Sequence, residues 1–172
     1  MITVLSGTNR KQNKTLTFAE KYCERLKIKG QNYQLFSLED LPDDFSLSQM
    51  YDYSHPGIQL LIEKYLISVD KLVIISPEYN GSFPGVLKVF IDSVKPSYFK
   101  DKKIALVGIS EGRSGNLRGM DNLTNILHYV NAEVLSYKLP VSKISSILKE
   151  SVIEDENLVS AFDLQIDRLL SM

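Results

Sequence analysis

The sequence of 172 residues has no tryptophan, a single cysteine and only two histidines. Because Cys23 has no second cysteine to pair with in the chain, we expect a protein of a reducing compartment. His55 and His128 stand far apart without a neighbouring cysteine or carboxylate cluster, which argues against a zinc site, and we assign no metal ligand. No Ser/His/Asp or Cys/His set stands out either, so the sequence predicts no catalytic nucleophile or general acid from the chain itself.

The chain also lacks an excess of charge of one sign and a long apolar run. It has 20 basic and 21 acidic residues, for a formal net charge of -1. Proteins that bind nucleic acid or anionic membranes need a basic excess or stripe, so we expect neither as a partner. No apolar stretch reaches the length of a signal or transmembrane segment, and we expect a cytoplasmic protein with one domain over residues 1–172.

Short apolar runs alternate with amphipathic segments along the chain. We predict five strands, at residues 2–5, 33–38, 72–75, 103–109 and 133–137. Apolar residues at helical spacing predict helices between them and a closing helix over 153–170, while the acidic segment 39–56 is expected to be a long connecting loop.

The alternation without hairpin signals predicts an α/β fold. We expect a three-layer sandwich, with a five-stranded parallel sheet in the order 2-1-3-4-5 and helices on both faces. In that order the loops after the first, third and fourth strands meet at one crevice, where the strand order reverses.

The first of these loops, SGTNRKQNKT, is rich in hydroxyl and amide side chains and opens a helix. Thr8, Asn13 and Thr15 offer polar groups, Arg10 offers a rigid fork of donors, and the helix N-terminus attracts anions. This composition favours a phosphate monoester, since the sequence has neither GxGxxG nor a lysine-serine pair closing a glycine-rich loop. The alternative is that Thr8 or Asn13 caps the helix and Arg10 is solvated.

The stretch PEYNGSFPGVLKVFIDS follows the third strand and leads into a helix. Its glycine, proline and small polar residues can bring main-chain N–H groups close to a ligand. Together with Glu78, Tyr79 and Asn80, such a loop suits a flat heteroaromatic ring with polar atoms at its edge. The alternative is an ordinary tight turn at Asn80-Gly81.

The loop after the fourth strand contributes a third set of polar residues: Ser110, Glu111, Gly112 and Arg113. These could contact the edge of the same ring or meet a second, anionic substrate. The alternative is a solvated connection.

Taken together, SGTNRKQNKT, PEYNGSFPGVLKVFIDS and SGNLRGMDNL resemble the NADPH-dependent FMN reductase family, which includes azo, quinone and chromate reductases on a flavodoxin-like fold. The resemblance covers residues 2–135. It implies a bound FMN, NADPH or NADH as electron donor, and a small acceptor such as a quinone, an azo compound, chromate or free flavin. It also implies a homodimer or homotetramer with the active site near the interface, to which residues 51–53 could contribute.

The resemblance also implies roles for the three loops. The first loop would hold the FMN phosphate through Thr8, Arg10, Asn13 and Thr15. The second would lie against the isoalloxazine through Pro77, Glu78, Tyr79, Asn80, Gly81 and Ser82, with the main chain of Tyr79 to Ser82 as the candidate N–H donors to the reduced ring. The third would contact the flavin or the nicotinamide through Ser110, Glu111, Gly112 and Arg113.

The chain departs from the family pattern at two places. The family usually has serine at the positions of Thr8 and Asn13, so an amide replaces a hydroxyl at Asn13. A double glycine is common where this chain has Gly115-Asn116, so we expect the third loop to hold its part of the ligand less closely.

Two further hypotheses fit the same sequence. A flavodoxin-type electron carrier would also bind FMN, but such carriers tend to be strongly acidic and this chain is nearly neutral. A flavodoxin-like interaction domain without a cofactor would account for the altered third loop. We favour an FMN-dependent NAD(P)H oxidoreductase, in which the cofactor supplies the redox chemistry.

Overall fold

A parallel sheet forms the centre of the protein. The computed structural model describes residues 1–149 and 152–172. Its main path has the order β2-β1-β3-β4-β5, and the strands are β1 (Ile2–Ser6), β2 (Tyr33–Ser37), β3 (Lys71–Pro77), β4 (Lys103–Ile109) and β5 (Glu133–Val134). The predicted strand order is therefore confirmed.

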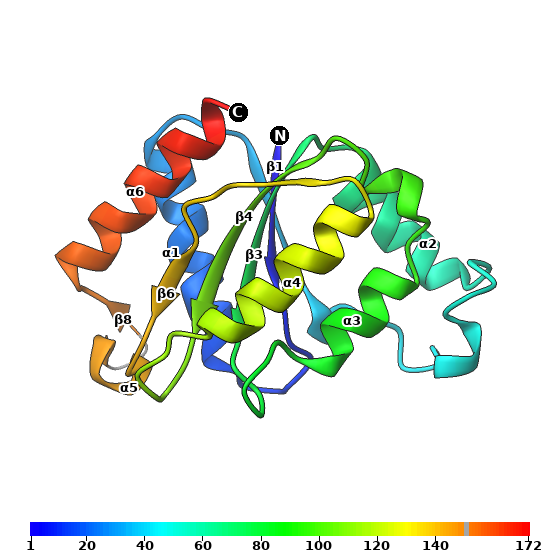
Figure 1. Cartoon of the computed structure of the whole chain (residues 1–172), viewed down its shortest axis with the longest axis horizontal. Helices are drawn as coiled ribbons and strands as arrows, with labels where there is room; N and C mark the ends of the chain where they lie inside the picture. The colour runs from blue at the N-terminus through cyan, green and yellow to red at the C-terminus, as the bar shows by residue number, and fades with distance from the viewer. Residues whose placement is uncertain (150–151) are drawn as a thin grey trace.

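Helices cover both faces of the sheet (Figure 1). Helices α1 (Lys14–Ile28) and α6 (Glu156–Leu170) lie on one face, and α2 (Pro56–Ile62), α3 (Gly85–Asp92) and α4 (Leu117–Tyr129) lie on the other. Each layer has its own apolar core, because the central strands bury side chains on both faces. The first core includes Val4, Tyr22, Val107 and Phe162, and the second includes Leu5, Ile62, Leu87, Phe90 and Leu123.

The last part of the sheet differs from the prediction of one strand over 133–137. Strand β5 pairs only with Lys103 and Ile104, at the start of β4, and a separate strand, β6 (Leu139–Val141), pairs with Val107 to Ile109 at its end. The predicted fifth strand is therefore present, but it ends at Val134 and not at residue 137. Two short strands pair with the same neighbour instead.

Two other segments also differ from the sequence-based expectation. The predicted closing helix begins at Glu156 instead of residue 153, because the Asp155 side chain accepts a hydrogen bond from Leu158 N at 2.9 Å and caps it there. Helix α5 (Ile144–Ile147) precedes a small antiparallel pair, β7 (Leu148–Lys149) with β8 (Val152–Ile153).

The acidic loop over 39–56 contains two short 3-10 turns and also leads into α2. The turns are η1 (Leu38–Asp40) and η2 (Leu47–Gln49), and η1 begins one residue before the loop. A third turn, η4 (Pro96–Tyr98), follows α3, and α2 continues as one π-helical turn, η3 (Glu63–Ile67).

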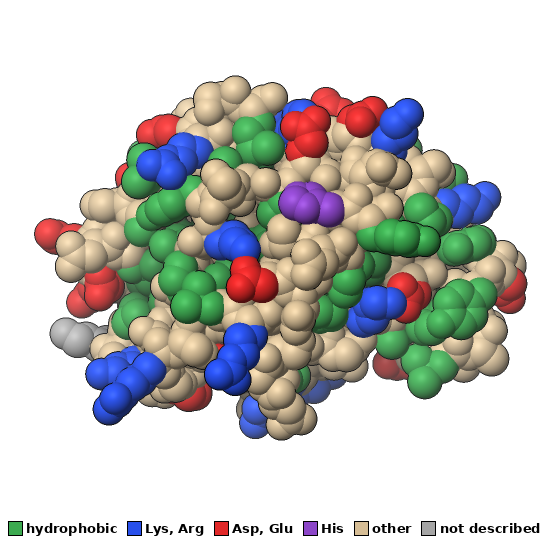
Figure 2. Space-filling model, viewed as in Figure 1, with side chains coloured by type: hydrophobic (Ala, Val, Ile, Leu, Met, Phe, Trp, Pro, Cys, Tyr) green, Lys and Arg blue, Asp and Glu red, His purple; other side chains and the backbone are tan. Residues whose placement is uncertain are grey.

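The carboxyl ends of the parallel strands all lie at one edge of the sheet. The loops after β1, β3 and β4 therefore gather there, at the lower edge in Figure 1, and both chain termini lie at the opposite edge. Lys/Arg and Asp/Glu side chains are interspersed over the face formed by α3 and α4, with no stripe of one sign (Figure 2). None of the helices within residues 1–149 and 152–172 is long and apolar enough to cross a bilayer.

Candidate functional site

The loops after β1, β3 and β4 surround one pocket at the carboxyl edge of the sheet. Its volume is about 440 Å³, and it is lined by residues 10–15, 77–79 and 109–111 together with Ile144. Volumes of this size are typical of small-molecule sites. Arg10 and Tyr79 therefore border the same pocket, as a ligand that spans both loops requires.

Asn13 organises the first loop. Its Oδ1 accepts a hydrogen bond from Leu16 N at 2.8 Å and so caps α1. Its Nδ2 donates to Arg10 O at 2.8 Å and to the Glu39 carboxylate. All the polar groups of this side chain are engaged, so the structure gives Asn13 the capping role that was the alternative to phosphate binding.

The first turn of α1 leaves main-chain donors at the pocket. Lys14 and Thr15 line it, and their N–H groups make no hydrogen bond with any residue that the structure describes. Free N–H groups at a helix N-terminus form an anion site. Thr15 itself is only 2% exposed.

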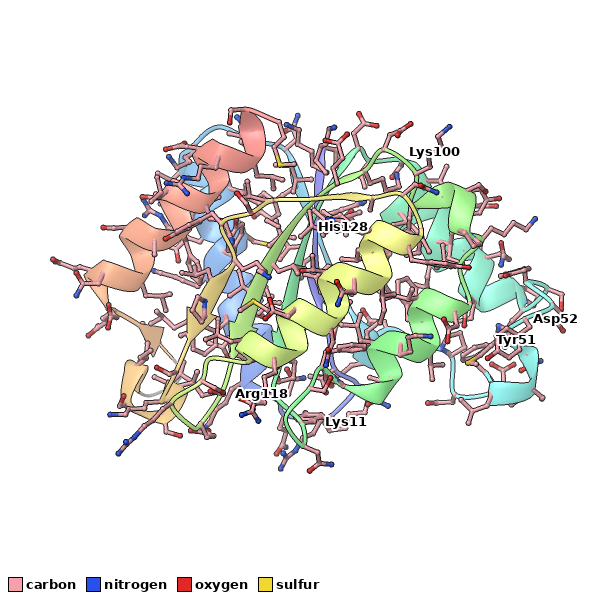
Figure 3. All side chains as sticks on the ribbon, viewed as in Figure 1. Lys11, Tyr51, Asp52, Lys100, Arg118 and His128 are labelled. Carbon is pink, nitrogen blue, oxygen red and sulfur yellow. The ribbon has the colours of Figure 1, made fainter. Side chains whose placement is uncertain are left out.

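Basic side chains surround this helix N-terminus. Arg10 is exposed, and its guanidinium has no ion pair or hydrogen bond among residues 1–149 and 152–172. Lys11 Nζ lies 3.9 Å from the Glu39 carboxylate, and Figure 3 shows Lys11 at the same edge of the molecule as Arg118. Lys11 and Lys14 belong to the loop identified from the sequence, but the predicted phosphate-binding residues, Thr8, Arg10, Asn13 and Thr15, did not include them.

Thr8 and Tyr79 connect the first and second loops. Thr8 is fully buried, and its Oγ1 lies 2.9 Å from the Tyr79 hydroxyl oxygen. The same Oγ1 accepts a hydrogen bond from Arg10 N at 3.3 Å. Thr8 is outside the pocket lining, so it supports the loop from beneath while the ring of Tyr79 borders the pocket.

Asn80 and Gly81 form the tip of a tight turn, which was the alternative to a ligand-binding role in the sequence analysis. Their φ angles are 52° and 79°, and the turn is closed by hydrogen bonds from Tyr79 N to Ser82 O at 2.8 Å and from Ser82 N to Tyr79 O at 3.1 Å. The N–H groups of Tyr79 and Ser82 are therefore already used, which corrects the expectation that they donate to a ring. Asn80, Gly81 and Ser82 lie outside the pocket lining.

The third loop is tied to both of the other loops. Ser114 Oγ donates to the Glu78 carboxylate, and Glu78 N donates to Ile109 O at 2.9 Å. Glu111 accepts from Lys14 Nζ at 2.5 Å and from Ser145 Oγ at 2.6 Å. These bonds, that from Lys14 first, lower the pKa of the Glu111 carboxyl.

Ser110, Gly112 and Arg113 have different positions in this loop. Ser110 Oγ lines the pocket rim but accepts from Gly115 N at 2.9 Å and donates to Gly112 O at 3.1 Å, which folds the loop back on itself. Gly112 and Arg113 are exposed outside the pocket lining. Of the four residues named from the sequence, only Ser110 and Glu111 reach the pocket.

Asn116 is a buried residue of the site that the sequence did not single out for a role. Its Nδ2 donates to Ser76 O and to Pro77 O, each at 3.0 Å. The sequence shows only a departure from a double glycine. No sequence pattern reveals a hydrogen bond between Asn116 and the end of β3, because the two segments lie 40 residues apart in the chain.

Fold and site together define an α/β protein with a helix N-terminus beside a polar pocket at the point where the strand order reverses. The fold is flavodoxin-like, as the sequence predicted. The chain belongs to the NADPH-dependent FMN reductase family, whose model matches residues 1–145.

Two curated relatives are similar to this chain in sequence. The chain is 30% identical over 110 residues to a 2-hydroxy-1,4-benzoquinone reductase from Burkholderia sp, which covers 55% of this chain and 60% of that protein. It is 29% identical over 113 residues to an FMN-dependent NADPH-azoreductase from Staphylococcus aureus, which covers 63% of this chain and 60% of that protein. The chain thus spans 60% of the length of these relatives.

A similar solved structure is FerB, a flavoenzyme NAD(P)H:(acceptor) oxidoreductase from Paracoccus denitrificans. It superposes with a TM-score of 0.77 at 22% identity, covering 99% of this chain and 97% of that one. At this identity the likeness concerns the fold.

Proposed function

We propose that this protein is an FMN-dependent NAD(P)H oxidoreductase that passes electrons to a small acceptor. The observation that carries the proposal is that Arg10, the N-terminus of α1 and Tyr79 border one pocket. Family membership and the names of the relatives, a benzoquinone reductase and an azoreductase, support the same reaction class.

The donor set around α1 fits the phosphate of FMN. Lys14 and Thr15, whose N–H groups are unengaged, line the pocket, and Arg10 lines the same pocket. A phosphate monoester would be held by the helix dipole and by charge-assisted hydrogen bonds. Asn13 and Thr8 would hold the loop in shape without touching the phosphate.

The second and third loops suit the ring system. Pro77, Glu78 and Tyr79 form one wall, and Ser110 and Glu111 form another. Asn80 and Gly81 lie outside the lining but directly follow Tyr79, which borders the pocket. Their N–H groups make no hydrogen bond with residues of the described chain, and we propose them as donors to a ring that extends past Tyr79 and carries negative charge.

Bound FMN would accept a hydride from the nicotinamide and release electrons to a quinone, an azo compound or a similar acceptor. The chain would bind and orient the flavin. No side chain is then needed as an acid or a nucleophile.

We also propose a cytoplasmic homo-oligomer. A groove of about 390 Å³ between α3 and α4 is lined by Tyr51, Tyr53, Ile91, Ile126 and Tyr129, among others, and Tyr129 is 86% exposed. An apolar groove of this kind fits a second copy of the chain. Sedimentation of the wild type and of Tyr129→Ser would test this, and a monomeric wild type at micromolar concentration would rule it out.

A visible absorption spectrum tests the proposed activity. The protein, mixed with FMN and freed of excess, should show the flavin bands, lose them when NADPH or NADH is added under nitrogen, and regain them when a quinone is supplied. A preparation that takes up no FMN would refute both the oxidoreductase and the flavodoxin-type electron carrier, since each requires bound FMN. One that binds FMN but is not reduced by either nucleotide would favour an electron carrier.

A further inference from the structure

Asn116, the residue before α4, lies between the second and third loops of the pocket. It is fully buried, with a φ of 60°, in the left-handed region where asparagine and glycine are the usual residues. Its Nδ2 donates to the carbonyl oxygens of Ser76 and Pro77, the last two residues of β3. These carbonyls immediately precede Glu78 and Tyr79, so one side chain of the third loop holds the main chain from which the second loop starts.

The surrounding backbone leaves room for this amide. A Cβ on Gly119 would lie 2.0 Å from Asn116 Oδ1, and one on Gly108 would lie 3.0 Å from Asn116 Cβ. Oδ1 is buried and accepts no hydrogen bond from the residues that the structure describes. The hydrogen bonds of this side chain all come from Nδ2 and go to the end of β3, including a longer one to Ser76 Oγ at 3.4 Å.

The main chain at the start of the second loop is also held by the bond from Glu78 N to Ile109 O at 2.9 Å, and two further contacts act on side chains of the loop. Ser114 binds the Glu78 carboxylate, and Thr8 binds the Tyr79 hydroxyl. Asn116 is the side chain that acts on the main chain of Ser76 and Pro77, so together with the bond from Glu78 N to Ile109 O it helps to set the course of the chain into the loop. Because reduced flavin gains negative charge, the positions of the N–H groups in this loop influence both the affinity for the flavin and its potential.

We propose that Asn116 is a positioning residue for the flavin, which fixes the loop 77–82 through the carbonyls of Ser76 and Pro77. This inference rests on the proposed function. It reverses the expectation from the sequence that Asn116, by replacing the second glycine of a pair, makes the third loop hold its part of the ligand less closely.

The first test is Asn116→Gly, with FMN binding and the midpoint potential of bound FMN as readouts. Glycine adopts a positive φ freely, so the backbone conformation is retained while both hydrogen bonds are lost. We expect the dissociation constant for FMN to rise by at least about fivefold, the effect of one net hydrogen bond, and the potential at saturating FMN to become more negative. The matched control is Asn131→Gly, because Asn131 is exposed and also has a positive φ, 61°.

The second test is Asn116→Asp, which keeps the shape of the side chain. An ionised carboxylate cannot donate to the two carbonyl oxygens, whereas a protonated carboxyl can donate once. We therefore expect FMN affinity in this variant to improve as the pH falls from 8 to 6, relative to the wild type over the same range. This measurement remains decisive if Asn116→Gly fails to fold.

The outcomes separate the inference from the function on which it rests. Wild-type affinity and potential in Asn116→Gly, or a pH profile of Asn116→Asp that parallels the wild type, would overturn the inference alone. A wild-type protein that takes up no FMN would overturn the proposed function and the inference with it.

Discussion

Replacing Arg10 by alanine tests the phosphate end of the proposed flavin site most directly. Arg10 borders the pocket, and its guanidinium makes no hydrogen bond or ion pair with the described residues, so the substitution removes a donor without breaking an internal bond. Substitutions of such exposed residues usually change stability by no more than about 0.5 kcal/mol. We therefore expect an unchanged melting temperature in the absence of FMN.

The loss of affinity can be estimated from the bond that would be lost. A hydrogen bond to a charged group contributes about 1.5–3 kcal/mol, which corresponds to a rise in the dissociation constant of about 10- to 150-fold. Lys14 and the N–H groups of α1 would remain, so some affinity should persist. The difference between wild type and Arg10→Ala should shrink as salt is added, because the site is open to solvent.

Fluorescence titration with FMN and with riboflavin provides the assay. Riboflavin lacks the phosphate, so its affinity should be the same in wild type and variant. Arg113→Ala serves as the control, since Arg113 is also an exposed loop arginine but lies outside the pocket lining. Equal FMN affinity in wild type and Arg10→Ala, or an equal loss for riboflavin, would refute the assignment of Arg10 to the phosphate.

Three further predictions concern the support of the site and the core. Tyr79→Phe removes the hydroxyl beside buried Thr8 and should lower the free energy of unfolding in urea by about 1 kcal/mol; an equally stable variant would show that this contact contributes nothing. Gly119→Ala introduces a Cβ at 2.0 Å from Asn116 Oδ1 and should cost about 1–3 kcal/mol in the same assay, so a variant of wild-type stability would contradict the packing described. Burial raises the pKa of the Cys23 thiol to about 12, so the thiol stays protonated at pH 8 and should react with a thiol reagent only after unfolding; fast labelling of the native protein would be inconsistent with its burial.

The fold was largely predictable because its pattern is local. The apolar runs of β1, β3 and β4 are bounded by polar loops, and strict alternation with helices allows few arrangements of a parallel sheet. The prediction gave the wrong end for the fifth strand, at residue 137, and the wrong start for the closing helix, at residue 153. Pairing with the distant strand β4 decides where the short strands after residue 133 begin and end. The hydrogen bond to the Asp155 side chain decides where α6 begins.

The site was predictable only as a set of loops. Composition alone identified the segments that gather at the carboxyl edge, and both Arg10 and Tyr79 border the pocket. The role of each side chain depended on neighbours from other segments. Glu39 helps to engage the amide of Asn13, and the pairing of Tyr79 with Ser82 removes two N–H groups from use.

Hydrophobic periodicity and chain connectivity can be read along the chain, and they are enough to predict a parallel α/β sheet with three polar loops where the strand order reverses. Which polar atoms remain free for a ligand, and which hold the loops together, depends on contacts between distant segments and became visible in the folded structure. Asn116 is the clearest case, since its amide reaches the end of β3 across 40 residues of chain, and such a distance is fixed by packing and not by the order of the residues.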